Sequence, residues 1–210
     1  MTGGTGIIEL KKKGQSINLT KKGNDVGEIL VNLNWNQKSK VAKSSGFLSS
    51  LFGGGQKNFD LDLGCLYELN SGEKGCVQAL GNAFGSLKDF PYIQLDHDDR
   101  TGASTGGENL RINGSRIKDI KRVLVYAFIY EGAANWSEAG GIVKLTYGGG
   151  EDIVVKLDEH RNGQIMCAIA MIENVQNETF SVKRLVDYFP GHAKMDQAYG
   201  WGMSWKAGSK

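Results

Sequence analysis

Proline is nearly absent from this sequence, with 2 residues in 210, whereas glycine contributes 30. This combination indicates many tight turns without proline-rich linkers, and the glycines lack the three-residue period of collagen. No stretch approaches the roughly eighteen consecutive apolar residues that a membrane-spanning helix needs. The N-terminus also lacks the charged segment and apolar run of a secretory signal. The composition, with 40% hydrophobic and 23% charged residues, predicts an ordinary globular protein. The odd number of cysteines without a signal segment predicts a cytoplasmic location.

Familiar catalytic motifs are missing too. The sequence contains no GxSxG elbow, no phosphate-binding loop ending in Gly-Lys-Ser/Thr and no HExxH pair. Its three histidines, His97, His160 and His192, are far apart and are expected at the surface or in turns. The three cysteines form no CxxC pair, which predicts reduced, buried thiols. These absences weigh against zinc sites and the common hydrolase and nucleotide-binding chemistries.

Positive charge gathers in the first 57 residues, which hold nine lysines against three acids, a balance of +6. The remainder holds 16 basic and 20 acidic residues, a balance of −4. A nucleic-acid surface usually combines Arg and Lys with aromatic residues, but this region has no Arg and only three aromatics, Trp35, Phe47 and Phe52. We therefore expect a solvated charged face and no nucleic-acid partner.

Short alternating or apolar runs separated by Gly, Asn and Asp turns predict about ten strands and little helix. One short helix is expected near Ser115–Ile120 or in the last 20 residues. The run Arg122–Tyr130 is almost continuously apolar, as in a central strand covered on both faces. The fold class predicted is all-β, a two-sheet β-sandwich. The predicted strands are Ile7–Leu10, Ser16–Leu19, Glu28–Trp35, Phe59–Leu66, Val77–Ala79, Leu110–Ile112, Arg122–Tyr130, Ile142–Tyr147, Asp152–Leu157, Gln164–Asn174 and Thr179–Tyr188.

One segment, Asn36–Lys57, differs from the rest because it is rich in Ser, Gly and Lys and is longer than most loops. We expect a mobile insertion in a single domain that spans residues 1–210. Its lysines, beside the apolar pairs Phe47-Leu48 and Leu51-Phe52, allow a weaker hypothesis of contact with an anionic membrane surface. The simpler interpretation is a flexible loop.

Two acidic stretches carry the most information. In Asn58–Leu63, alternation places Asp60 and Asp62 on one strand face and the apolar residues on the other. Two like charges so close are tolerated on a solvated face, or around a cation. The second stretch contains Asp96, Asp98 and Asp99 and returns, after a glycine-rich turn, to Glu108 and Asn109. Such a loop offers the mixed oxygen ligands that calcium prefers, although it is not an EF-hand. From composition alone, a solvated turn remains the leading interpretation of this loop.

Longer motifs make the chain resemble the bacterial TerD-type tellurium-resistance and stress-response family. The matching stretches are Ile8–Lys21, Ile29–Trp35, Phe59–Asp62, Asp98–Gly102 with Gly107–Asn109, and Val123–Tyr130 with Asn135-Trp136. Within the family, the TerA-type branch is the most similar, through Pro91–Asp96, Asp99–Gly102, Tyr130–Gly132, Ala168–Asn174 and Ala198–Gly202.

The resemblance implies a calcium-binding β-sandwich without known catalytic activity. It implies a role in tellurite resistance as a scaffold or sensor that acts with other Ter proteins, near the inner face of the cytoplasmic membrane. The implied calcium ligands are Asp60, Asp62, Asp98, Asp99, Glu108 and Asn109. Where the family loop often carries further acids, this chain has Ala103, Ser104 and Thr105, so one site or a weak one is expected. The alternative is an enzyme, for example a thiol-dependent protein acting on tellurium oxyanions, which would need a reactive cysteine.

Overall fold

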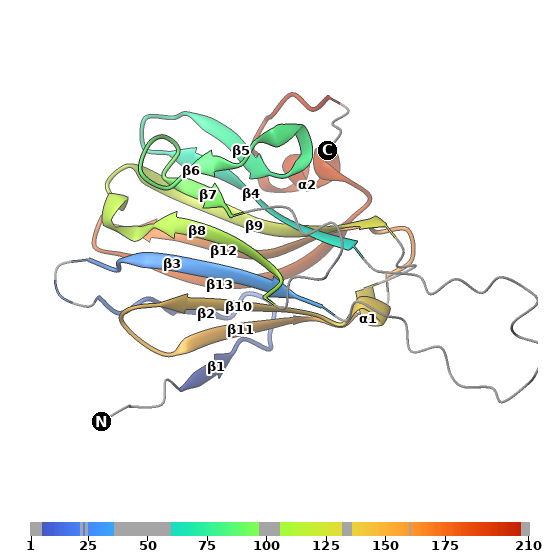
Figure 1. The fold of residues 1–210 in the computed structure, drawn as a ribbon, viewed down its shortest axis with the longest axis horizontal. Helices are drawn as coiled ribbons and strands as arrows, with labels where there is room; N and C mark the ends of the chain where they lie inside the picture. Colours follow the sequence, from blue (N-terminus) through green and yellow to red (C-terminus); the bar gives the residue numbers. More distant parts are fainter. Residues whose placement is uncertain are drawn as a thin grey trace, which may run out of the picture.

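A computed structural model describes the fold over residues 6–21, 23, 25–35, 60–96, 106–131, 136–159 and 161–206. Two β-sheets face each other, with their strands running in roughly the same direction (Figure 1). This is the two-sheet, all-β architecture that the sequence predicts. The predicted single domain over 1–210 stays a prediction, and the segment 36–57 lies outside the described residues. Among the residues that are described, no helix is long and apolar enough to cross a membrane.

The first sheet has seven strands in the order β1-β11-β10-β3-β8-β7-β6. Its pairs are antiparallel, except that β1 runs parallel to β11 at the edge. Buried and less buried residues alternate along β3 and β8, so one face of this sheet packs inward and the other faces solvent. The strands are β1 (Ile7–Glu9), β3 (Glu28–Asn34), β6 (Gly85–Ser86), β7 (Ile93–Leu95), β8 (Glu108–Asn113), β10 (Gly141–Tyr147) and β11 (Asp152–Leu157).

The second sheet has six antiparallel strands in the order β2-β13-β12-β9-β4-β5. Its central strands are buried on both faces, and every residue of β4 is buried. The strands are β2 (Ser16–Asn18), β4 (Asp60–Leu69), β5 (Lys74–Gln78), β9 (Ile120–Glu131), β12 (Met166–Val175) and β13 (Thr179–Phe189). The prediction that residues 122–130 form a central strand covered on both sides is confirmed by β9.

Each predicted strand segment overlaps an observed strand, with different bounds in most cases, and the structure adds two strands that the sequence did not reveal. Both additions, β6 and β7, are too short to display an alternating pattern. The helical elements among the described residues are also short. They are the 3₁₀ turns η1 (Leu80–Asn82) and η2 (Gly114–Arg116) and the helices α1 (Trp136–Ala139) and α2 (His192–Tyr199). Of the two places considered for one short helix, the last 20 residues contain α2 and the other contains only the 3₁₀ turn η2, whereas α1 was not predicted.

Two separate hydrophobic clusters follow from this arrangement. The larger lies between the sheets and includes Leu61, Leu63, Val125 and Ile169. The smaller lies on the outer face of the second sheet, where Leu66, Leu124 and Phe128 contact Met195 and Trp201 of the C-terminal segment. We call residues 192–206, which comprise α2 and the chain after it, the C-terminal cap. The cap is why β4 and β9 are buried on both faces.

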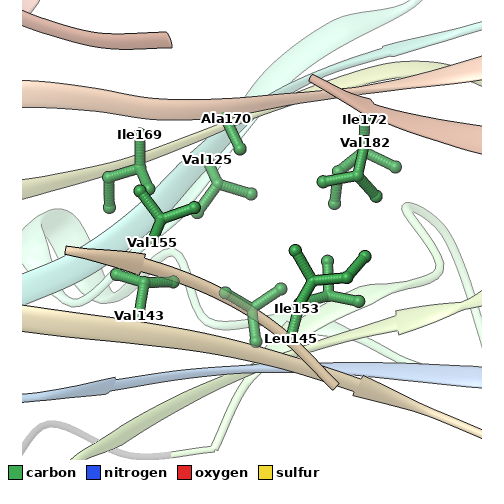
Figure 2. A pocket seen from close by; sticks show the side chains of 10 residues that line it. Val125, Val143, Leu145, Ile153, Val155, Ile169, Ala170, Ile172 and Val182 are labelled. Atoms are coloured by element: carbon green, nitrogen blue, oxygen red, sulfur yellow. The ribbon is translucent and has the colours of Figure 1, made fainter. Parts of the chain in front are cut away.

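A small cavity of about 10 Å³ lies in the core between the sheets (Figure 2). Every side chain around it is apolar, and the space barely equals one water molecule, so it is a dry packing gap and no ligand site. Its lining residues are Val31, Val125, Val143, Leu145, Ile153, Val155, Ile169, Ala170, Ile172 and Val182.

Enlarging this cavity should destabilise the fold. Val155 is 3% exposed and lines the gap, so Val155→Ala should lower the free energy of unfolding by about 2 kcal/mol. The neighbouring Lys156 points outward and pairs with Glu9 at 3.0 Å, so Lys156→Ala should cost less than about 1 kcal/mol. Urea denaturation would measure both changes. Equal effects of the two substitutions would contradict this account of the core.

Candidate functional site

The predicted acidic pair stands at the start of β4. Leu61 and Leu63 belong to the core between the sheets, so alternation directs Asp60 and Asp62 to the outer face of the second sheet. Neither carboxyl is solvated, since Asp60 is 9% and Asp62 0% exposed. The interpretation that Asp60 and Asp62 lie on a solvated face is therefore wrong. Both residues make interactions within the fold, and burying two neighbouring carboxylates demands compensation of their charge.

The acidic end of the predicted loop enters the fold from the other sheet. Glu108 begins β8, is 0% exposed, and accepts a hydrogen bond at Oε2 from the backbone N–H of Leu63 at 2.6 Å. Asn109, the next residue, points to the opposite face, where its Oδ1 accepts a hydrogen bond from Asn32 Nδ2 at 2.9 Å. The structure thus brings the Glu108 carboxylate to the backbone of β4, one residue from Asp62, but directs Asn109 away from the inter-sheet space.

The remaining two predicted ligands, Asp98 and Asp99, lie outside the described residues, as do His97 and His160. Within the described part of the chain, no three His, Cys, Asp or Glu side chains are grouped closely enough to hold a metal ion. Asp60, Asp62 and Glu108 therefore do not form such a group by themselves, and the calcium site remains a prediction.

One acidic residue near the pair could not be recognised from the sequence. Glu131, the last residue of β9, is directly opposite Asp60 in the strand register and is exposed. The register shifts between Asp60 and Leu61, so the pairing fixes the position of Glu131 beside Asp60 at this end of the sheet but not the face on which its side chain projects. Only the pairing of β4 with β9 reveals it, because 71 positions separate the two residues in the chain.

A buried polar and aromatic cluster lies next to Asp62 on the outer face. Gln78 Oε1 accepts a hydrogen bond from the Tyr126 hydroxyl at 2.6 Å and lies 3.0 Å from His192 Nε2. The His192 ring is 5.3 Å from the Phe128 ring and 4.7 Å from the Trp205 ring, centre to centre. His192, the first residue of α2, is half-buried and thus more enclosed than the expected surface position, because the cap packs its ring against the sheet.

His192 should make the fold sensitive to acid. Burial lowers its pKa from 6.5 to about 4, so the folded protein keeps it neutral at pH values where the unfolded chain is protonated. The contribution of neutral His192 to the free energy of unfolding should therefore be fully present above about pH 6.5. It should decline toward pH 4, by up to about 3 kcal/mol. The other ionisable groups nearby are Tyr126, Asp62, whose negative charge contributes to the raised pKa of Tyr126, and Asp196 on α2.

The test compares the native sequence with His192→Gln, by urea denaturation between pH 7.5 and pH 4.5 in the presence of a chelator. The substitution should flatten the decline, because Gln does not titrate, while leaving the contributions of the carboxylates in place. Parallel stability curves for the two proteins would show that His192 is not the sensitive group.

The cysteines have the character of packing residues. Cys65 and Cys167 are buried and Cys76 is partly buried, and all three are free thiols. Burial raises the pKa of each thiol, most strongly for Cys65 and Cys167. A raised pKa disfavours the thiolate, which is the nucleophilic form. The prediction of buried thiols is confirmed for Cys65 and Cys167, whereas Cys76 is only partly buried.

Alkylation of the folded protein at pH 8 should therefore be slow. Cys76 should react first, and Cys65 and Cys167 should react only after unfolding in guanidinium. Peptide mass spectrometry of samples taken over time would assign each label, with the unfolded protein as the control for complete reaction. Rapid labelling of Cys65 or Cys167 in the folded state would revive the thiol-enzyme hypothesis.

The two-sheet fold, with Asp60 and Asp62 on β4, is the basis for comparison with known β-sandwich proteins. The sequence profile of the family described as TerD domain matches residues 7–179, and the chain belongs to this family. It is also similar to the tellurium resistance protein TerA of an Alcaligenes species, with 45% identity over 203 residues. The aligned region covers 97% of this chain and 58% of that protein, so the chain spans well under two thirds of its relative.

Solved structures with similar folds come from more distant proteins. A crystal structure of a homologue of telluride resistance protein (TerD) from Streptomyces coelicolor A3(2) has a TM-score of 0.54 and 17% identity. The protein of unknown function SAV2460 has a TM-score of 0.55 and 12% identity. The alignments cover 81% of this chain in both cases, and 95% and 94% of the two solved chains. At these identities the likeness concerns the fold alone.

Proposed function

We propose that this chain is a calcium-binding, non-catalytic module of the tellurite-resistance and stress-response system, and that it acts as a scaffold or sensor with other Ter proteins. The observation that carries the proposal is the buried pair Asp60 and Asp62, on a strand of a TerD-domain protein. The name of the similar protein, a tellurium resistance protein, supports the cellular role. A location in the cytoplasm, at the inner face of the membrane, belongs to the same proposal.

The chemistry of the acidic pair fits calcium. Positions two apart on a strand are roughly 7 Å apart at Cα, so carboxylates on the same face can converge on an ion with oxygen–calcium distances of 2.3–2.6 Å. A dication would also neutralise charges that are expensive to bury. All the donors are oxygens, which favours a hard cation over the softer metals that prefer imidazole or thiolate.

The pair needs further oxygens to reach the six to eight that calcium takes. We propose that Asp98 and Asp99 supply them, with Glu108 and Asn109 anchoring the end of that loop to β8. Glu108 is held in place by the hydrogen bond that its Oε2 accepts from the Leu63 N–H. Calcium would act here by holding the loop against the strand, which is a binding role and requires no bond-making step.

Calcium should stabilise the protein if this proposal is correct. At 100 times its dissociation constant, calcium should add about 2.7 kcal/mol, which corresponds to a rise of a few degrees in the melting temperature. Magnesium should substitute poorly, because it demands a tighter octahedral shell. Melting curves in calcium, magnesium and excess chelator would measure these shifts.

The substitutions Asp60→Asn and Asp98→Asn should each abolish the calcium-induced shift and leave the chelated protein as stable as before, or slightly more stable. Asp89→Asn, at an exposed carboxyl in the loop between β6 and β7, is the matched control and should keep the full response. A full calcium response in both Asp60→Asn and Asp98→Asn would place the site elsewhere.

The alternative function, a thiol-dependent enzyme, has less support from this chain. Its cysteines are buried or partly buried, and the pKa of each thiol is raised. Negative charge from Asp187 and Glu159 also raises the pKa of the Cys167 thiol. Such surroundings suit packing better than nucleophilic attack.

A further inference from the structure

The C-terminal cap lies outside the part of the chain that matches the family profile, which ends at residue 179, yet it packs against Phe128, the β9 residue opposite Asp62 in the strand register. We infer that the cap is a functional part of the calcium site, and that His192 and Trp205 are positioning residues for Asp62. This inference rests on the calcium-binding function proposed above. It assigns those two residues a role beyond packing.

Internal hydrogen bonds order the cap. The Asp196 carboxylate is buried and accepts hydrogen bonds from Gly202 N at 2.7 Å, Met203 N at 2.8 Å and Trp205 Nε1 at 2.8 Å. These bonds fold the last described residues back onto α2. The Trp205 ring is thereby fixed beside the His192 ring, at 4.7 Å between centroids.

A second set of contacts fastens the cap to the sheet. Trp201 is 2% exposed, and its Nε1 donates a hydrogen bond to the Tyr67 carbonyl at 3.0 Å. The Arg122 guanidinium lies 3.8 Å from the centre of the Trp201 ring, and Lys74 Nζ donates to the Trp201 carbonyl at 3.0 Å. This anchor is distinct from the contacts made by His192 and Trp205, so those two residues can be altered without removing it.

His192 carries the contact toward the acidic pair. Its ring packs edge-on against Phe128 and Tyr126 of β9, at 5.3 Å and 5.5 Å between centroids. In the strand register Phe128 is directly opposite Asp62, and Tyr126 is opposite Gly64. Asp62 therefore shares its face with Phe128 and has Tyr126 as its diagonal neighbour. The cap presses on the two aromatic side chains that border Asp62.

Two consequences follow for an ion bound by Asp62. With the cap docked, the aromatic wall is fixed and water is kept from this side of the carboxylate, so a charged ligand interacts with it more strongly. Conversely, a cation that neutralises the acidic pair removes a charge buried beneath the cap and favours docking. The two events stabilise each other, and thermodynamic linkage requires the coupling to be equal in both directions.

The experiment measures calcium binding by titration calorimetry in the full chain and three variants. Trp205→Ala removes the ring that supports His192 and should weaken calcium binding about tenfold, within the usual range for coupled sites. Trp205→Phe keeps an aromatic ring there and should restore affinity to within about threefold. Val155→Ala, which loosens the core between the sheets, should bind calcium with unchanged affinity and controls for simple destabilisation.

Hydrogen exchange provides a readout that does not depend on the titration. Calcium should slow exchange at the Gly202 and Met203 amides, which are bonded to Asp196. It should not change exchange in β1, at the far edge of the first sheet.

The outcomes separate the two proposals. If the native chain binds calcium but Trp205→Ala binds it equally well and the cap amides do not respond, the cap inference is overturned and the proposed function stands. If the native chain binds no calcium, both are overturned. Weakening by Trp205→Ala with no effect of Val155→Ala supports the inference.

Discussion

The structure depends on the burial of β4 and β9 on both faces. A sandwich of two sheets covers one face of each sheet, so these central strands need a second cover. The cap supplies it by placing Met195 and Trp201 against Leu66, Leu124 and Phe128. Asp60 and Asp62 lie on this same outer face of β4, and both carboxyls are buried.

Much of this fold was predictable from the sequence because strand alternation is a local property. In β4, alternation indicated which residues share a face, and the apolar run of β9 indicated a strand covered twice. What covers β4 was not predictable, since it comes from residues more than 120 positions later in the chain. The alternating pattern around Asp60 and Asp62 is identical whether their side of the strand is exposed to solvent or covered by another layer of the protein.

In the candidate site, too, the sequence indicated local features but not which residues come together in the fold. The sequence grouped Glu108 and Asn109 as the end of one acidic loop, but adjacent residues of a strand point to opposite faces. Glu108 consequently binds the Leu63 N–H of the other sheet, while Asn109 pairs with Asn32 on the outside. Glu131 went unnoticed because only strand register places it opposite Asp60. The sequence motifs indicated which acidic residues could form the site, whereas the pairing of the strands determines which of these residues lie close together.

The Asp196 carboxylate has a consequence for the cost of docking. Ordering a flexible chain on a surface usually loses conformational entropy for each residue that becomes fixed. Here one carboxylate already ties three groups of the following residues to α2, so the cap can approach the sheet with much of its shape set in advance. Preorganisation of this kind lowers the entropic penalty of association. The cap therefore resembles a small rigid ligand, already ordered and covalently attached to its binding surface, more than a flexible tail.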